Sequence, residues 1–595
     1  MNAINYLSMI KNNSEINADW VEGYTLDDIG SRISLIWCSI FGFIGIMLRF
    51  YRLGDMPLSD IEVHDALLAW LMVTDQHLWD AGWLANSSLV HFSQIILFWI
   101  TGTANSVSAR IISAICGSAL IFVPLLFARH LGKGGVGLTM AMLAVSPSLV
   151  IVSRTADGMA LALICLVIAL VGLERTKNNS GIDGIKMILV GVVLGIMCGR
   201  NFIVPFLLIG FILMRQLNIA RRVLETLRES SFGSALAYSV VVLIVLTTFF
   251  RYRYGLMAVA ESWVQWIAGW SPYVRTRSAL LIPDISLSNQ PLLLLLSVVG
   301  GGIYIQRKCV ERTLLVLVVC GLLYGLIYPG IQSTDVVWVI TPLFVFCAFV
   351  ALWALQDVWS SRELTVVGIQ GLILGSLIVF GYILFGGVDL PTNIAAYSDR
   401  NYILVQAFIL LGMLILVVAL FSVGWSWKIS KASMTIIVLI FSVFWSMHRS
   451  WNMVRFPNNS YASAWYKAWP TGTGNIMVKT LGNLSLEFTG HPREVDIKVI
   501  SPYNRQIAWR LREFSNLEWD ENTGFVDYPS VIITPGTGLS IGVGPGYIGQ
   551  EFRLYDNFDN DNPLFVAHNY NSKSRYIASD VDRLVVWARQ GDRIP

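Results

Sequence analysis

The chain has 595 residues, of which 55% are hydrophobic and only 14% charged, and its mean hydropathy is +0.61. This composition excludes a soluble globular protein and is typical of a chain that crosses a membrane many times. The formal net charge of only +3 provides no basic surface of the kind that binds nucleic acid, so we expect no nucleic-acid partner.

The amino-terminal end and the cysteines narrow the class further. Residues 1–32 are polar and lack the charged and apolar regions of a cleaved signal, so we expect the first apolar run to be retained as an anchor. The seven cysteines lie in or beside apolar runs and form no CxxC pair. The sequence therefore indicates neither a disulfide framework nor a zinc site.

After residue 32 the chain consists mostly of apolar runs up to residue 447. Most of these runs have nearly the ~20 residues that a bilayer-crossing helix needs. We predict about thirteen transmembrane helices, at 33–50, 109–131, 135–152, 159–174, 185–199, 201–214, 233–250, 291–306, 313–329, 337–355, 364–386, 403–424 and 432–447. The run 89–104 is short and contains His91, Ser93 and Gln94. We interpret it as a juxtamembrane helix that does not cross the bilayer.

Loop charges support this interpretation. If 89–104 does not cross, every lysine of the membrane region falls in loops of one side, which the positive-inside rule assigns to the cytoplasm. The expected protein is a multi-pass cell-membrane protein with residues 1–32 in the cytoplasm and a transmembrane domain at 33–447. Its first outer loop, 51–108, then carries juxtamembrane helices, and residues 448–595 form an extracytoplasmic domain.

The tail after Met447 is polar and reads as a small α/β domain. Apolar runs at 495–500 and 530–534 predict strands, and 507–514 between them predicts a helix. The glycines of 542–546 do not lie between a clear strand and helix, so they predict a turn instead of a nucleotide-binding loop.

The densest acidic cluster of the membrane region follows the first apolar run, at Asp55, Asp60, Glu62, Asp65, Asp75 and Asp80. Paired carboxylates such as Asp60 and Glu62 can hold a divalent metal or act as a general base. The plainer interpretation is a solvated acidic loop. Under the predicted topology, Arg154 and Asp157 lie on the same side, where they form either an ion pair or part of the same site.

Positive charge on the outer side is all arginine, whose fork binds phosphate in a bidentate manner. Candidate ligands for an anionic lipid carrier are Arg154, Arg200, Arg251 and Arg253. The alternative is that these side chains reach toward lipid headgroups. Trp263, Trp266 and Trp270 share one face of a predicted helix, which forms either an interfacial belt or a gate over a lipid or sugar site.

These motifs together resemble the GT-C superfamily of polyprenyl-phosphate-sugar-dependent glycosyltransferases, which includes protein O-mannosyltransferases and the aminoarabinose transferase of lipid A. The resemblance covers roughly residues 33–175. It is carried by RLGDMPL at 52–58, the DxE at 60–62, Gly102, Ala109–Arg110, Gly117, the basic turn at 129–133 and the segment from Ser146 to Asp157. The segment 508–519 also looks like one near the end of a prokaryotic flippase-associated or mannosyltransferase-like branch.

The resemblance implies a GT-C-like fold, a polyprenyl-phosphate-linked sugar as donor and a first-loop carboxylate as catalytic base. Glu62 matches the family glutamate, but Ile61 stands where an aspartate usually precedes it, and Asp60 is displaced by one position. If this segment is already helical, one residue corresponds to a rotation of ~100°, which would direct Asp60 away from the family position.

Three hypotheses of function follow. In the leading one, an inverting glycosyltransferase activates an unidentified acceptor (protein, glycan or lipid) with Asp60 or Glu62 while Asp157 assists. Arg154 and one or more of the other outer arginines then hold the carrier phosphate, and a metal enters at Asp60 and Glu62 only if the enzyme is metal-dependent. The second is a non-catalytic GT-C-fold subunit, which Ile61 favours. The third is a lipid-linked-sugar flippase, for which we find few ionisable residues in the spans and no inverted repeat.

Overall fold

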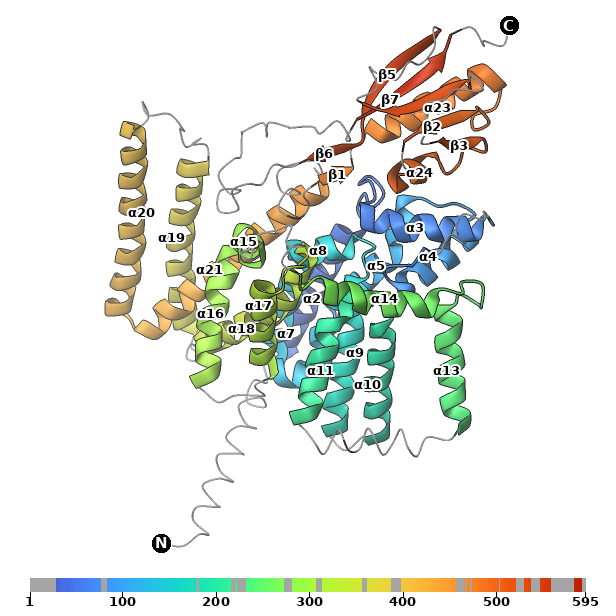
Figure 1. The fold of residues 1–595 in the computed structure, drawn as a ribbon. Helices are drawn as coiled ribbons and strands as arrows, with labels where there is room; N and C mark the ends of the chain where they lie inside the picture. The colour runs from blue at the N-terminus through green and yellow to red at the C-terminus, as the bar shows by residue number, and fades with distance from the viewer. Residues whose placement is uncertain are drawn as a thin grey trace.

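The structure is a computed structural model. It describes residues 28–75, 83–177, 181–215, 221, 232–271, 281–306, 313–355, 361–386, 397–455, 465, 468–470, 473–501, 503–520, 529–536, 546–557 and 583–590. A bundle of helices makes up most of it, and a small sheet domain stands at one end of this bundle (Figure 1).

Each of the thirteen predicted apolar segments is helical. They correspond to α2 (Asp28–Phe50), α5 (Ser106–Ile121) with α6 (Val123–Leu126), α7 (Ala128–Val145) with α8 (Pro147–Ser153), α9 (Met159–Lys177), α10 (Gly181–Ile196), α11 (Ile203–Arg215), α13 (Phe232–Leu246), α16 (Pro291–Gln306), α17 (Thr313–Ile327), α18 (Val337–Leu355), α19 (Ser361–Gly386), α20 (Tyr397–Gly424) and α21 (Trp427–Arg455).

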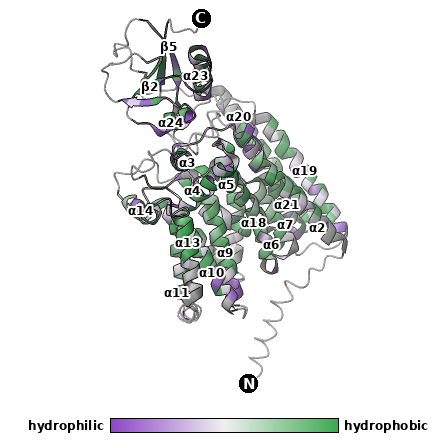
Figure 2. Cartoon of the chain, turned by 90° about the vertical axis from the view of Figure 1, so that its right-hand side faces the viewer, coloured by the Kyte–Doolittle hydropathy of each residue, from purple (hydrophilic) through white to green (hydrophobic). Residues whose placement is uncertain are grey.

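Five helices of the described residues are long and apolar enough to cross a membrane by themselves, and a bent pair brings the number to six. The pair is 134–145 with 147–153, which meet at 61°. The bend falls at Ser146, whose extended backbone conformation precedes Pro147, because a residue before proline is disfavoured in the helical region. Hydrophobic residues predominate along the helices of the bundle, whereas hydrophilic residues occur at helix ends and in parts of the sheet domain (Figure 2). The chain is therefore a multi-pass membrane protein.

Three helices lie across the ends of the long ones, on the side that faces the sheet domain (Figure 1). They are α3 (Asp60–Val73), α4 (Ser88–Thr101) and α14 (Gly255–Ala268). The run 89–104 forms α4, which has 14 residues and is one of several apolar helices too short to cross a membrane by themselves. That it does not cross the bilayer stays a prediction.

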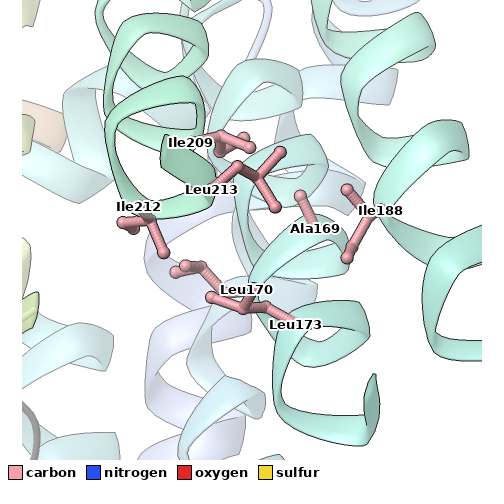
Figure 3. A pocket seen from close by; sticks show the side chains of 7 residues that line it. All are labelled: Ala169, Leu170, Leu173, Ile188, Ile209, Ile212 and Leu213. Atoms are coloured by element: carbon pink, nitrogen blue, oxygen red, sulfur yellow. The ribbon is translucent and has the colours of Figure 1, made fainter. Parts of the chain in front are cut away.

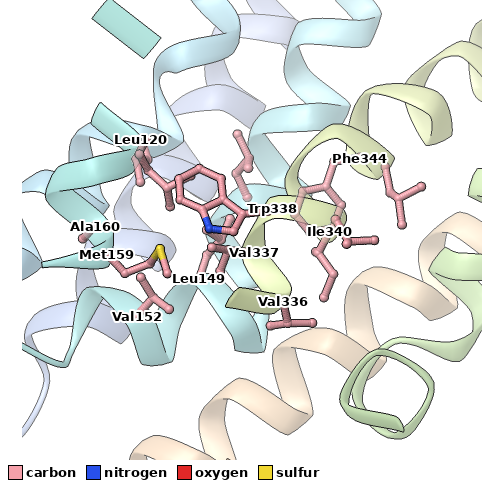
Figure 4. Packing of buried hydrophobic residues seen from close by; sticks show 14 of the residues in the cluster. Leu120, Leu149, Val152, Met159, Ala160, Val336, Val337, Trp338, Ile340 and Phe344 are labelled. Atoms are coloured by element: carbon pink, nitrogen blue, oxygen red, sulfur yellow. The ribbon is translucent and has the colours of Figure 1, made fainter. Parts of the chain in front are cut away.

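The centre of the bundle is a continuous apolar core around α18. The indole of Trp338 is buried among Leu120, Leu149 and Met159, which come from three other helices (Figure 4). This packing joins the amino-terminal half of the bundle to α18. A small crevice between α9, α10 and α11 is lined only by apolar side chains such as Ala169, Ile188 and Ile209 (Figure 3), so it carries no chemistry.

The sheet domain contains the predicted strand–helix–strand unit as β2 (Ile497–Ile500), α24 (Arg505–Leu511) and β4 (Val531–Pro535). Further strands complete a five-stranded sheet of order β3-β2-β4-β7-β5, and α23 (Thr473–Thr489) packs against it. The additional elements are β3 (Leu517–Asp520), β5 (Tyr547–Arg553) and β7 (Arg583–Arg589), with a separate pair β1 (Ala468–Pro470) and β6 (Tyr555–Asn557). Strands β3, β2 and β4 run parallel, whereas β7 pairs antiparallel with β4 and β5. Of the predicted turn at 542–546, only Gly546 lies within the described residues.

Candidate functional site

Helix α3 begins at Asp60, and this start determines where the two candidate carboxylates point. The backbone N–H and hydroxyl of Ser59 both donate to Glu62, as in a capping box that begins a helix. Residues that are two positions apart in an α-helix are separated by about 200° around its axis, so Asp60 and Glu62 face opposite sides. Asp60 is exposed, whereas Glu62 is fully buried.

Glu62 forms the centre of a buried hydrogen-bond network. Arg110 of α5 donates from Nε to Oε1 and from Nη2 to Oε2, both at 2.6 Å, and the N–H of Ala156 donates at 2.8 Å. With the two bonds from Ser59, five hydrogen bonds reach this carboxylate. Burial raises the pKa of Glu62, but the charge and hydrogen bonds of Arg110 outweigh it, so the net direction is downward. A carboxylate held this way is poorly suited to accept a proton.

Arg110 completes the network by donating to the carbonyl oxygens of Leu53, Met56 and Pro57. The pair thereby ties the first loop to α5 and to the junction of α8 and α9. Its role in the structure is to hold these segments together.

Arg154 is also occupied within the protein. Its guanidinium donates to the carbonyl oxygens of Leu48, Arg49, Tyr51 and Arg52 at 2.7 to 3.2 Å. These carbonyls belong to the last turn of α2 and to the two residues that follow it, where a cation is favourable. The structure thus pairs Arg154 with a helix end, and not with Asp157 as an ion pair.

Asp60 faces the sheet domain. Its Oδ1 accepts hydrogen bonds from Gln506 Nε2 at 2.9 Å and from the hydroxyl of Tyr555 at 2.6 Å. Within the described residues, its Oδ2 has no protein partner. Because Asp60 and Glu62 diverge and Glu62 is neutralised by Arg110, the two do not fit a shared metal site. Nor do the described residues contain any group of three or more His, Cys, Asp or Glu side chains placed to hold a metal.

Asp157 follows Ala156, whose N–H donates to Glu62, and precedes α9 in the chain. Its Oδ1 accepts the N–H of Met159 at 3.0 Å, and its carbonyl accepts from Asn201 Nδ2 at 2.5 Å. Burial raises its pKa to about 7, and the nearby charges of Glu62 and Asp335 act in the same direction. No cation in the described part of the chain pairs with this carboxylate. It is therefore a group that can gain or lose a proton near neutral pH.

Arg200 and Asp335 flank Asp157 on the other side. Arg200 belongs to the short helix η2 (Gly199–Phe202) and donates to the carbonyl of Gly330 at 3.0 Å. Its Nη2 lies 3.9 Å from Asp335 Oδ2, in η4 (Ser333–Val336), and a quarter of its side chain remains exposed. Asp335 was not among the sequence candidates. The available signal was a single carboxylate within the apolar stretch 313–355, which marks a functional site by default in a membrane protein.

Aromatic rings border this charged group. The ring centroids of Tyr324 and Tyr328 are 4.9 Å apart, Trp266 stacks on Tyr328 at 5.7 Å, and Trp270 meets it edge-on at 5.3 Å. The tryptophan-rich face of α14 therefore packs beside the Arg200–Asp335 pair. The interfacial belt and the gate stay the two predictions for this face.

The remaining predicted arginines lie elsewhere. Arg251 contacts Asp75 of the first loop at 2.5 Å, with both side chains exposed, and the guanidinium of Arg253 lies 5.0 Å from the centre of the Tyr254 ring. The structure thus links Glu62, Asp157 and Arg200 in sequence. Glu62 accepts the N–H of the residue before Asp157, and the carbonyl of Asp157 accepts from the residue after Arg200. The structure places Asp60 toward the sheet domain and Arg251 beside the first loop.

Comparison with solved structures identifies the fold. ArnT from Cupriavidus metallidurans in the apo state matches with a TM-score of 0.51 at 14% identity, over 95% of this chain and 100% of that chain. The same protein bound to undecaprenyl phosphate matches with a TM-score of 0.51 at 13% identity, over 94% and 99%. No protein-family model and no curated protein matches the sequence. ArnT is a lipid A aminoarabinose transferase with the GT-C fold, so the predicted GT-C-like architecture is confirmed.

Proposed function

We propose that this protein is a membrane glycosyltransferase that moves a sugar from a polyprenyl-phosphate carrier to an acceptor outside the cytoplasm. The observation that carries the proposal is the fold shared with ArnT, whose matching structures include one bound to undecaprenyl phosphate. The match extends over the first loop, the helical bundle and the sheet domain, because it covers 94% of this chain. The desolvated Asp157, whose carbonyl accepts a hydrogen bond from Asn201 next to Arg200 in the chain, supports it independently of the fold.

In this proposal the charges divide the work. Arg200 keeps a quarter of its side chain exposed and is the cation that we assign to the phosphate that leaves with the carrier. Asp60 accepts the proton of the acceptor hydroxyl or amide through its unengaged Oδ2, and Asp157 assists by holding or exchanging a proton. Arg251 and Arg253 are exposed candidate contacts from the loop side, and we expect each to contribute less to carrier binding than Arg200. Glu62, Arg110 and Arg154 maintain the frame that positions these groups.

The proposed orientation follows the lysine distribution. Residues 1–32 are cytoplasmic, and the sheet domain is extracytoplasmic, on the same side as α3 and α4 (Figure 1). A reporter enzyme fused after Pro595 should behave as extracytoplasmic in the cell membrane. A cytoplasmic reporter signal would contradict this orientation.

One observation favours a second function, that of a non-catalytic GT-C-fold subunit. Glu62 is immobilised by Arg110, and Ile61, where the family aspartate is expected, is 42% exposed. A subunit of this kind would bind the carrier or a partner protein and transfer no sugar.

Purified protein in lipid nanodiscs distinguishes these functions. It would be incubated with labelled undecaprenyl-phosphate-linked hexoses and pentoses and a membrane fraction that supplies acceptors. A glycosyltransferase removes label from the carrier, and Asp60→Asn should abolish this while undecaprenyl phosphate still binds. Carrier binding without transfer would favour the subunit, and failure to bind undecaprenyl phosphate would contradict the proposed function.

A further inference from the structure

The sheet domain reaches into the first loop at Asp60. Gln506 of α24 is only 2% exposed, and its Nε2 donates to Asp60 Oδ1 and to the carbonyl of Leu58, both at 2.9 Å. Tyr555 donates its hydroxyl to the same Oδ1 at 2.6 Å. Two residues that lie 446 and 495 positions further along the chain thus hold one oxygen of this carboxylate.

An apolar interface keeps Gln506 in place. Ala508 and Trp509 of α24 are buried in a cluster with Val63 and Leu67 of α3 and Phe98 of α4. The side chain of Asn504 accepts N–H groups at the start of α24, which fixes where this helix begins. Because both faces of the contact are buried and apolar, the Gln506 donor is presented by a rigid element. Tyr555 begins β6 and packs against the core of the sheet domain.

Another residue of α24, Arg510, adds positive charge near the contact. Arg510 follows Gln506 by four positions, so both lie on one helix face. Its guanidinium is buried and close enough to interact electrostatically with Asp60 and Tyr555. Space for it exists because Gly474 of α23 has no Cβ, which would overlap the guanidinium.

We propose that Gln506 and Tyr555 are positioning residues for Asp60, and that the sheet domain is in this way part of the transfer site. An exposed aspartate samples several rotamers, whereas two donors on Oδ1 select the one that leaves Oδ2 toward the acceptor. This inference rests on the proposed function, since it concerns how the base is oriented. The two donors would also orient the Asp60 side chain, which lies one position before the place where the family has its aspartate.

Two variants test the proposal, with a matched control in the same domain. Tyr555→Phe removes one donor and keeps the ring, and Gln506→Met removes the other at similar length. Tyr547→Phe is the control, because its hydroxyl donates to the carbonyl of Pro529 within the sheet domain. The assay is transfer from the labelled undecaprenyl-phosphate sugar that the wild type uses, with carrier binding and thermal unfolding measured on the same preparations.

Each test variant should lower kcat about tenfold, the size expected for one hydrogen bond to a charged group, while KM for the carrier changes less than about twofold. The control should behave as wild type. Test variants with the kcat of the control would overturn the inference, as would a loss expressed only in KM or in unfolding temperature. A wild type that transfers no sugar would instead refute the proposed function, and this inference with it.

Discussion

Arg110 and Glu62 are 48 residues apart, yet they form a bidentate ion pair with no exposed surface and two contacts of 2.6 Å. Such a pair gains little over apolar residues of similar volume, because both charges must lose their hydration. Losing one partner is far more costly, because a buried charge is left alone. The pair therefore makes the first loop, α5 and the start of the α9 segment interdependent, and this is the frame in which the candidate site lies.

The first prediction concerns this frame. Arg110→Met should destabilise the protein by roughly 3–5 kcal/mol, since Glu62 would remain buried without its cation. The measurement is the thermal unfolding midpoint of the purified protein in detergent. Asp55→Asn is the control, because both side chains of the Arg52–Asp55 pair are about half exposed and solvent screening leaves such a pair little effect on stability. Equal midpoints for the two variants would refute the structural role of Arg110.

Much of the fold could be predicted from the sequence, because hydrophobic runs dictate helices wherever the backbone has no water to bond. All thirteen apolar segments are helical, and the short run at 89–104 forms α4, which lies across the bundle. The sheet was harder to predict from the sequence. Its strands β5 and β7 pair across a long sequence separation, and pairing of that kind depends on tertiary contacts that no local pattern encodes.

The site was predicted only in part, for the same reason. The sequence identifies the carboxylates and arginines but not their partners. It therefore offers Arg154 as a candidate ligand for the carrier phosphate, whereas the structure shows its guanidinium bound to carbonyls at the end of α2. The directions in which the Asp60 and Glu62 side chains point depend on whether residue 60 is helical. Helix α3 begins at this residue, so the two side chains point to opposite sides. Asp335 is a single carboxylate in an apolar stretch, which is a signal that composition alone could have shown.

The second prediction separates the arginines. Arg200→Gln should weaken binding of undecaprenyl phosphate by roughly tenfold to a hundredfold, the range for a lost hydrogen bond to a charged group. Arg251→Gln should change it by less than threefold, since its side chain is exposed and contacts only Asp75 among the described residues. Affinity would be measured by titrating undecaprenyl phosphate into protein in nanodiscs. A larger loss from Arg251→Gln would move the carrier phosphate to the first loop.

The third prediction concerns pH. Asp157 has a pKa of about 7 in the folded protein, raised by burial, and about 3.9 when unfolded. Between these values the folded state binds the proton and the unfolded state does not, so the contribution of Asp157 to stability falls as pH rises from 4 to 7 and is constant above.

Asp157→Asn removes this titration and keeps a side chain that can cap α9. The variant should become more stable relative to wild type as pH rises, by up to about 4 kcal/mol at pH 8, which is the size of a shift of about three pKa units. Unfolding midpoints of both proteins across pH 4–8 measure the difference. A constant difference across this range would show that Asp157 ionises at its ordinary pKa.

The fourth prediction uses two glycines of α23. Gly474 lies against the buried guanidinium of Arg510, and a Cβ there would overlap it. Gly482 is in the same helix, and its nearest neighbour would be the carbonyl oxygen of Pro492 at an ordinary 3.7 Å. The two sites therefore separate the cost of displacing Arg510 from the intrinsic preference of a helix for alanine.

Gly482→Ala should stabilise the sheet domain by about 0.5–1 kcal/mol, because alanine loses less backbone entropy than glycine in a helix interior. Gly474→Ala should destabilise it by about 1–3 kcal/mol, because Arg510 must leave a buried position where its charge interacts with Asp60. Chemical unfolding of the full chain, followed by amide hydrogen exchange in α24 and β3, measures both, since these two elements report on the sheet domain. If Gly474→Ala also lowers sugar transfer while Gly482→Ala does not, the charge beneath Asp60 contributes to the site as well as to the domain. Stabilisation by both variants would show that Arg510 can move aside at no cost, and that the contact between α23 and α24 does not constrain Asp60.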